Sequence, residues 1–113
     1  MKGKEGIQIQ LEITEKALQK IKTISEKPVL LLWYDTDECG CGVNGLPTIR
    51  LAREIKESYM EVECSEMNVF VEKQQKVFFA ECMKLDWTGQ VFRLASPEQI
   101  MNPFIPASQI FTL

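Results

Sequence analysis

The sequence contains no histidine and no long apolar run. Without an imidazole, the chain cannot carry a serine or cysteine triad, an HExxH zinc site or a histidine proton relay. The longest strongly apolar stretch covers only residues 29–33, whereas a membrane-spanning helix needs about 20 residues. We therefore expect any chemistry to come from thiols, carboxylates or the backbone, and we expect no membrane partner.

A concentrated basic segment is also missing. Lys and Arg number 13 and Asp and Glu number 16, which gives a formal net charge of −3 and an isoelectric point near 5.0. Proteins that bind nucleic acid usually present a basic stripe, so we expect no nucleic-acid partner. The first residues are charged and no apolar segment follows them. This pattern indicates no secretory signal and predicts a cytoplasmic protein.

The length of 113 residues predicts a single domain over 1–113. Near the start, apolar and polar residues alternate, which predicts a half-buried N-terminal strand over 6–13. Thr14 then stands where a helix N-cap belongs, and apolar residues at helical spacing follow it. We therefore expect a helix over 14–25, which ends before Pro28.

The rest of the chain is dominated by short strand patterns. Residues 29–34 are apolar throughout and predict a buried strand, and alternating segments continue the main β region over 29–94. Three later prolines predict an irregular tail over 95–113, ending in a last short strand at 110–113. Together these elements predict a mostly-β fold, on the borderline of α+β, with about seven short strands and one N-terminal helix. A sandwich or barrel is the expected architecture.

The four cysteines are the residues best suited to carry chemistry. Cys39-Gly40-Cys41-Gly42 follows the expected buried strand, and two thiols one residue apart can point the same way if the glycine backbone bends. Two thiolates are half of a Cys₄ iron–sulfur or zinc site. Either Cys64 and Cys82 complete the site, or a second chain brings its own pair. The structural alternative is a glycine-rich turn that holds two incidental cysteines.

Acidic residues surround the first cysteine of this pair, since Asp35, Asp37 and Glu38 precede Cys39. Nearby negative charge raises the pKa of a thiol and disfavours the thiolate, which argues against a simple thiol redox role. A bound cation would reverse this effect of the carboxylates, because their negative charge then stabilises the positive charge of the cation.

The other two cysteines give weaker signals. Cys64 shares a strand face with apolar residues, which indicates packing as a small hydrophobe. The pattern around Cys82 does not establish which face it occupies.

Six short motifs follow one another in a particular order. They are Ile13-Thr14-x-x-Ala17, Val29 to Tyr34, Val69-Phe70-Val71-Glu72, Leu85-Asp86-Trp87, Phe92-Arg93-Leu94 and Ser96-Pro97. Their order resembles that of the HesB-like, or A-type iron–sulfur carrier, family of iron–sulfur cluster biosynthesis, and the resemblance covers about residues 13–97. It implies a small β-sandwich or pseudo-barrel with a helix packed at one side. It also implies a non-enzymatic protein with an iron–sulfur cluster or iron as cofactor, a homodimer, and iron–sulfur assembly proteins as partners.

In that family three cysteines of each chain hold iron or a cluster at a subunit interface, one after the second strand and two in a CxC near the C-terminus. The first position matches Cys39 or Cys41, but the C-terminal pair is absent because residues 96–113 contain no cysteine. Three hypotheses follow. The chain binds a cluster or iron through Cys39 and Cys41, with Cys82 and Cys64 as additional ligands; or it is an interaction module that has lost cluster binding; or it is a thiol redox protein.

Overall fold

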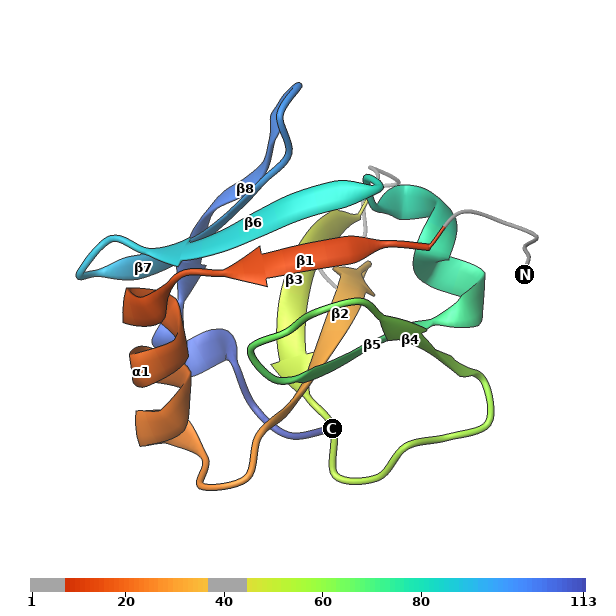
Figure 1. Cartoon of the computed structure of the whole chain (residues 1–113), viewed down its shortest axis with the longest axis horizontal. Helices are drawn as coiled ribbons and strands as arrows, with labels where there is room; N and C mark the ends of the chain where they lie inside the picture. Colours follow the sequence, from red (N-terminus) through yellow and green to blue (C-terminus); the bar gives the residue numbers. More distant parts are fainter. Residues whose placement is uncertain (1–7, 37–44) are drawn as a thin grey trace.

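The computed structural model describes residues 8–36 and 45–113 (Figure 1). Within these ranges, eight strands form two four-stranded sheets, accompanied by one α-helix and two short 3-10 helices. The helices are α1 (Glu15–Ile24), η1 (Lys73–Phe78) and η2 (Ala107–Gln109). The first sheet has the order β1 (Gln10–Ile13), β6 (Cys82–Trp87), β7 (Val91–Ala95) and β8 (Ile100–Pro106). The second has the order β3 (Leu46–Leu51), β2 (Val29–Asp35), β5 (Asn68–Glu72) and β4 (Tyr59–Val62).

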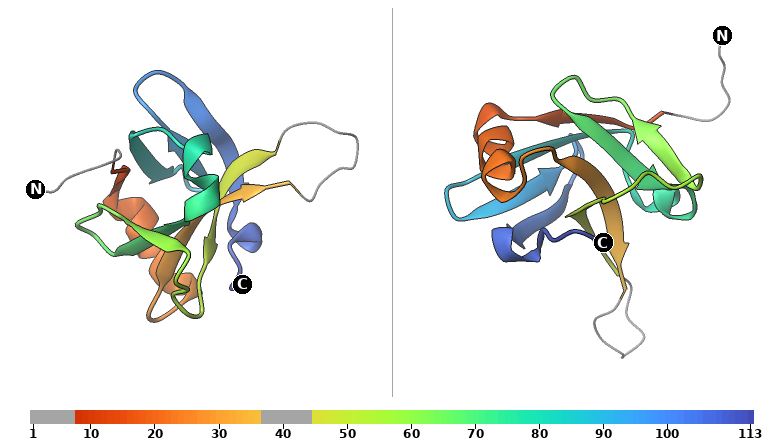
Figure 2. Two further views of the ribbon diagram at one scale, coloured as in Figure 1. Left: turned by 90° about the vertical axis from the view of Figure 1, so that its right-hand side faces the viewer. Right: turned by 90° about the horizontal axis from the view of Figure 1, so that it is seen from below.

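Both sheets are mixed. β1 runs parallel to β6 and β2 runs parallel to β5, while the other neighbouring strands are antiparallel. Glu63, directly after β4, pairs with Gln10 of β1 and links the two sheets there. Thr112, in the segment after β8, pairs with Leu51 of β3. The two sheets enclose one interior (Figure 2). The expectation of a mostly-β, HesB-like sandwich or pseudo-barrel is confirmed.

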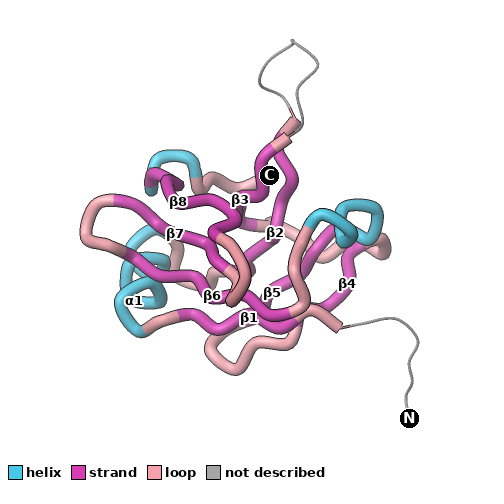
Figure 3. The backbone as a smooth tube through the Cα atoms, turned by 90° about the horizontal axis from the view of Figure 1, so that it is seen from above, coloured by secondary structure: helices cyan, strands magenta, loops and turns pink. Residues whose placement is uncertain are grey.

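The core lies between the sheets and is closed on one side by α1. Side chains alternate between the two faces of a strand, so each strand contributes every second residue to the interior. α1 adds Ala17 and Ile21, which are both fully buried. α1 and η1 lie on opposite sides of the strands in Figures 1 and 3. The fully buried strand residues of this core include Leu30, Leu32, Leu85, Phe92, Leu94 and Ile105.

Thr14 caps α1 and also attaches it to β6. Its hydroxyl oxygen accepts a hydrogen bond from the Ala17 amide at 3.2 Å, and its hydroxyl donates to Oδ1 of Asp86 at 2.8 Å. The same Asp86 oxygen accepts from the Trp87 amide at 2.8 Å. The expected helix over 14–25 is confirmed as α1 with Thr14 and Ser25 as its two caps. Two motifs of the family resemblance, the one that contains Thr14 and the one that contains Asp86, are therefore in contact, and this contact stabilises the fold.

The expected irregular tail over 95–113 is wrong for residues 100–106, which form β8 and pair with β7. Proline lacks the amide hydrogen of a strand ladder, so it is confined to edge strands and bulges. β8 has one ladder neighbour, β7, and Pro103 lies where the register between the two strands shifts. The last strand expected at 110–113 is reduced to a single bridge at Thr112.

The N-terminal strand expected over 6–13 is observed as β1 at Gln10–Ile13, while residues 6 and 7 lie outside the described residues. Among the described residues, no helix has the length and apolar character that crossing a membrane requires.

Replacing Thr14 by alanine should destabilise the fold by about 1–2 kcal/mol, because the helix loses its N-cap and α1 loses its side-chain link to β6. Chemical denaturation followed by circular dichroism measures the change. Thr14→Ser is the matched control, since it keeps a hydroxyl that can accept from Ala17 and donate to Asp86. Equal stability of the alanine and serine variants would contradict this role.

The hydrogen bond from Thr14 has the largest effect on the pKa of Asp86 and lowers it. Burial, the second effect, raises the pKa, and the hydrogen bond from the Trp87 amide lowers it, so that the pKa is lowered on balance. The ionised carboxylate is therefore favoured in the folded state. Its contribution to stability is present above the unfolded pKa of about 3.9 and is lost as the pH falls through the lower folded value. The stability difference between the natural chain and Asp86→Asn should shrink below about pH 4. Urea unfolding across that range tests this, and a difference independent of pH would contradict it.

Candidate functional site

The predicted ligands Cys39 and Cys41 lie in residues 37–44, outside the described residues. The chain on either side of this segment is described. β2 ends at Asp35, β3 begins at Leu46, and these two residues face each other in the antiparallel register of the two strands. Asp35 and Leu46, which flank the CxC segment in the sequence, therefore lie side by side at one paired strand end.

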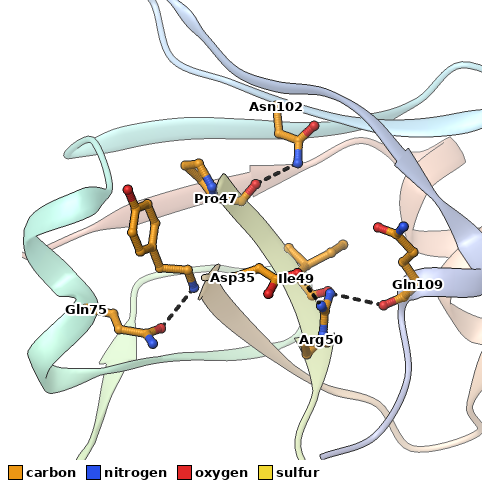
Figure 4. Close-up of polar contacts among 8 residues, drawn as sticks. Asp35, Pro47, Ile49, Arg50, Gln75, Asn102 and Gln109 are labelled. Atoms are coloured by element: carbon orange, nitrogen blue, oxygen red, sulfur yellow. Dashed lines mark hydrogen bonds and ion pairs between the residues drawn. The ribbon is translucent and has the colours of Figure 1, made fainter. Parts of the chain in front are cut away.

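Arg50 of β3 holds the β2 side of this strand end. Its Nη2 donates to Oδ2 of Asp35 at 3.2 Å, and its Nη1 donates to the carbonyls of Ile49 and Gln109, each at 3.1 Å (Figure 4). The Phe111 ring centroid lies 4.4 Å from Cζ of the guanidinium. Arg50 is only 5% exposed, and a buried cation is tolerated only when its N–H groups are paired. This network ties β2, β3 and the segment after β8 together.

Further contacts hold both strands beside the same end. The Tyr34 amide donates to Oε1 of Gln75 at 2.9 Å, and the Tyr34 ring stacks on Phe78 with centroids 3.7 Å apart. On β3, the carbonyl of Pro47 accepts from Nδ2 of Asn102 at 2.7 Å. η1 therefore holds β2, and β8 holds β3 (Figure 4).

Gly45 stands where the chain re-enters β3, in a space that admits no side chain. A Cβ at this position would lie 2.7 Å from the carbonyl oxygen of Asp35. It would also lie 2.8 Å from Cγ2 of Thr36 and from Cε2 of Tyr34. Glycine is needed here because the two strands approach each other more closely than a Cβ allows.

Cys64 and Cys82 line a separate cleft of about 520 Å³ between β1, β6 and the turn after β4. Cys64 is half-buried and donates to Oε1 of Glu66 at 3.3 Å, while the exposed Cys82 contacts Oε1 of Gln10 at 3.9 Å. Cys82 and Glu63 pair with Gln10 from opposite sides, which separates their backbones by two strand spacings, about 10 Å. Both thiols are free. Across the described part of the chain, no group of three metal-binding side chains comes together.

The turn after β4 lies at the other end of the second sheet from Asp35. Val62 pairs with Val69, which pairs with Leu30 near the start of β2, whereas the CxC segment follows the end of β2. Cys64 packs against the core, as expected from its strand pattern. Burial raises the pKa of the Cys64 thiol and outweighs the backbone hydrogen bonds that lower it. This site therefore disfavours the thiolate form, which is the form that binds metals.

A family model described as iron-sulphur cluster biosynthesis matches residues 9–108. The chain belongs to this family. It is similar to the uncharacterized protein YqkB of Bacillus subtilis (strain 168), with 32% identity over 94 residues that cover 81% of this chain and 88% of that protein.

Solved structures agree with this assignment at the level of the fold. A crystal structure of a candidate Fe-S biosynthesis protein from Lactobacillus acidophilus matches with a TM-score of 0.72 at 13% identity, covering 92% of this chain and 89% of that one. Escherichia coli SufA, a protein involved in the biosynthesis of iron-sulfur clusters, matches with a TM-score of 0.53 at 14% identity, covering 79% and 87%. At these identities the likeness concerns the fold alone.

Cys39 and Cys41 of this iron–sulphur cluster biosynthesis protein stay a prediction from the sequence, and the sequence patterns did not point to the residues that hold the strands on either side of the CxC segment. The sequence around Arg50 could have revealed its role. A charged residue between the apolar Ile49 and Leu51 of a strand indicates a buried cation that is paired with acceptors. Gln75 and Asn102 carried no such signal, because amide side chains are common on surfaces and their partners lie far away in sequence.

Gly45→Ala should destabilise the protein by about 1–3 kcal/mol, the usual cost of forcing extra atoms into occupied space. The closest atom is a backbone oxygen, which cannot rotate away as a side chain can. Thermal unfolding measured by calorimetry tests this expectation. An unchanged melting temperature would show that the strand end adjusts freely around residue 45.

Proposed function

We propose that this protein is a non-enzymatic carrier in iron–sulfur cluster biosynthesis, which binds iron or a [2Fe–2S] cluster as cargo through Cys39 and Cys41. The supporting observation is the paired end of β2 and β3, whose last and first residues, Asp35 and Leu46, flank the CxC segment in the sequence. Arg50, Gln75 and Asn102 hold the two strands on either side of it. Family membership supports the cargo, because the family is described by iron–sulphur cluster biosynthesis.

The number of thiolates supports a homodimer as the cluster-bound form. A [2Fe–2S] cluster is usually held by four thiolates, and one chain offers two in its CxC. Cys64 lies beside the start of β2 rather than its end, and its raised pKa disfavours metal binding. A second copy of the chain is therefore a better source of the missing thiolates than Cys64. We infer that the protein works in the cytoplasm, where reducing conditions keep such thiols available.

Electrostatics support a positively charged cargo. Asp35, Asp37 and Glu38 precede Cys39, and they disfavour a bare thiolate but favour a bound iron ion. Arg50 pairs with Asp35 and offsets one of these charges at the base of the segment. The carboxylates beyond the strand end then add to the attraction for a cation.

Anaerobic reconstitution with ferrous iron and sulfide tests the proposal. The natural chain should acquire visible charge-transfer absorption with two iron and two sulfide ions per pair of chains, because four thiolates hold one [2Fe–2S] cluster. The Cys39→Ser, Cys41→Ser variant should lose it. The matched control is Cys64→Ser, Cys82→Ser, which removes the same number of thiols from the separate cleft and should load normally. The proposal fails if the natural chain acquires neither visible absorption nor stoichiometric iron, or if the first variant still loads.

A second candidate is an interaction module that kept the fold and lost the cluster. One observation favours it: residues 96–113 contain no cysteine. This candidate predicts a metal-free monomer after reconstitution, so iron analysis and sedimentation distinguish the two functions.

A thiol redox role for Cys39 or Cys41 predicts a thiol pKa well below about 8.5, which alkylation rates at varied pH would detect.

A further inference from the structure

The 3-10 helix η1 presents apolar side chains to solvent. None of its residues is buried, and Val77 is 78% exposed and Phe78 44% exposed. It spans six residues, longer than the three or four that such helices usually reach. Exposed apolar side chains that are grouped together mark sites of interaction more often than those scattered singly. η1 therefore exposes apolar side chains to water, although none of its residues is buried in the core.

Val77 lies at the edge of a hollow with an apolar floor. The hollow has a volume of about 390 Å³, which is near the lower end of the range of pockets that bind small organic groups. Its floor includes Ile9 and Phe79, which both belong to the buried core. A large apolar side chain placed here would contact the core directly. Among the described residues, its lining consists of Ile9, Lys73, Lys76, Val77, Phe79 and Glu81.

The charge beside this hollow is positive, although the chain as a whole has a net charge of −3. Lys73 and Lys76 line the hollow. In the described part of the chain the one ion pair is Arg50 with Asp35, so neither lysine is paired with a carboxylate there. Glu81 also lines the hollow but pairs with neither of them. An apolar hollow with two available ammonium groups is complementary to an acidic partner.

The same element is connected to the strand that precedes the CxC segment. Phe78 stacks on Tyr34 with an interplanar angle of 5°, and Gln75 accepts a hydrogen bond from the Tyr34 amide. Tyr34 is followed by Asp35, the last residue of β2. A protein seated on η1 would therefore lie next to the strand end described above.

We propose that η1 and the adjoining hollow form a docking site for an acidic segment of a different protein. The segment places one large apolar side chain against Val77, Phe79 and Ile9, and its carboxylates lie beside Lys73 and Lys76. This inference does not require that Cys39 and Cys41 bind a cluster. A second copy of this chain is the competing occupant.

An NMR titration of the full ¹⁵N-labelled chain tests the proposal with three synthetic peptides as probes. The first contains a leucine and a phenylalanine flanked by glutamates, the second has lysines in place of the glutamates, and the third has alanines in place of the apolar residues. Only the first should give saturable amide shifts, at residues 73–79 and at Ile9. Its affinity should fall as the salt concentration rises, because screening weakens surface charge attraction.

Substitutions of exposed residues change peptide binding without removing a side chain from the buried core, so they distinguish a loss of docking from a loss of folding. Val77→Ser and the double variant Lys73→Glu, Lys76→Glu should each weaken binding of the first peptide by about tenfold or more, as expected for central contact residues. Ile55→Ser is the matched control, since Ile55 is 55% exposed but belongs to the loop between β3 and β4. It should leave binding unchanged.

Three results would overturn the proposal. The first is that no peptide gives saturable shifts, and the second is that the shifts map outside η1 and its hollow. The third is that the unliganded chain self-associates in sedimentation experiments and that Val77→Ser abolishes this association. That last outcome would make a second copy of the chain the occupant of the site.

Discussion

The buried guanidinium of Arg50 is the constraint on which the geometry of the candidate site depends. A cation that is 5% exposed needs partners for its N–H groups, since an unpaired buried charge would cost several kcal/mol. Its partners come from β2, from its own strand and from the segment after β8. The chain from Gln109 to Leu113 therefore lies along β3, where backbone hydrogen bonds with Leu51 continue the contact. The end of β2 at Asp35 is held by the same cation.

The residues that carry the family resemblance have structural roles, whereas the proposed chemistry belongs to other residues. Thr14 and Asp86 come from two separate motifs, and in the structure they form one hydrogen bond that attaches α1 to β6. Both residues therefore serve the fold rather than the proposed cargo site. Family membership over residues 9–108 and the proposed role of Cys39 and Cys41 thus rest on different residues of the chain.

The fold also separates three regions that could act independently. The CxC segment follows the paired end of β2 and β3, the other two cysteines share a cleft beside β1 and β6, and η1 carries the basic, apolar surface. Tyr34 links the first and third regions, because η1 contacts its ring and its amide.

The sequence by itself determined the local elements, because their signals lie within a few neighbouring residues. Period-two alternation predicted most strands, and Thr14 with the spacing that follows it predicted α1. β8 was missed because Pro103 and Pro106 oppose a strand unless the strand lies at an edge or a bulge, and only the sheet order reveals that. The tertiary structure alone decided that Cys64 and Cys82 share one cleft and that Arg50 reaches Gln109. These contacts join residues far apart in the chain, so they depend on strand register and on the closure of two sheets around one core, which no local pattern encodes.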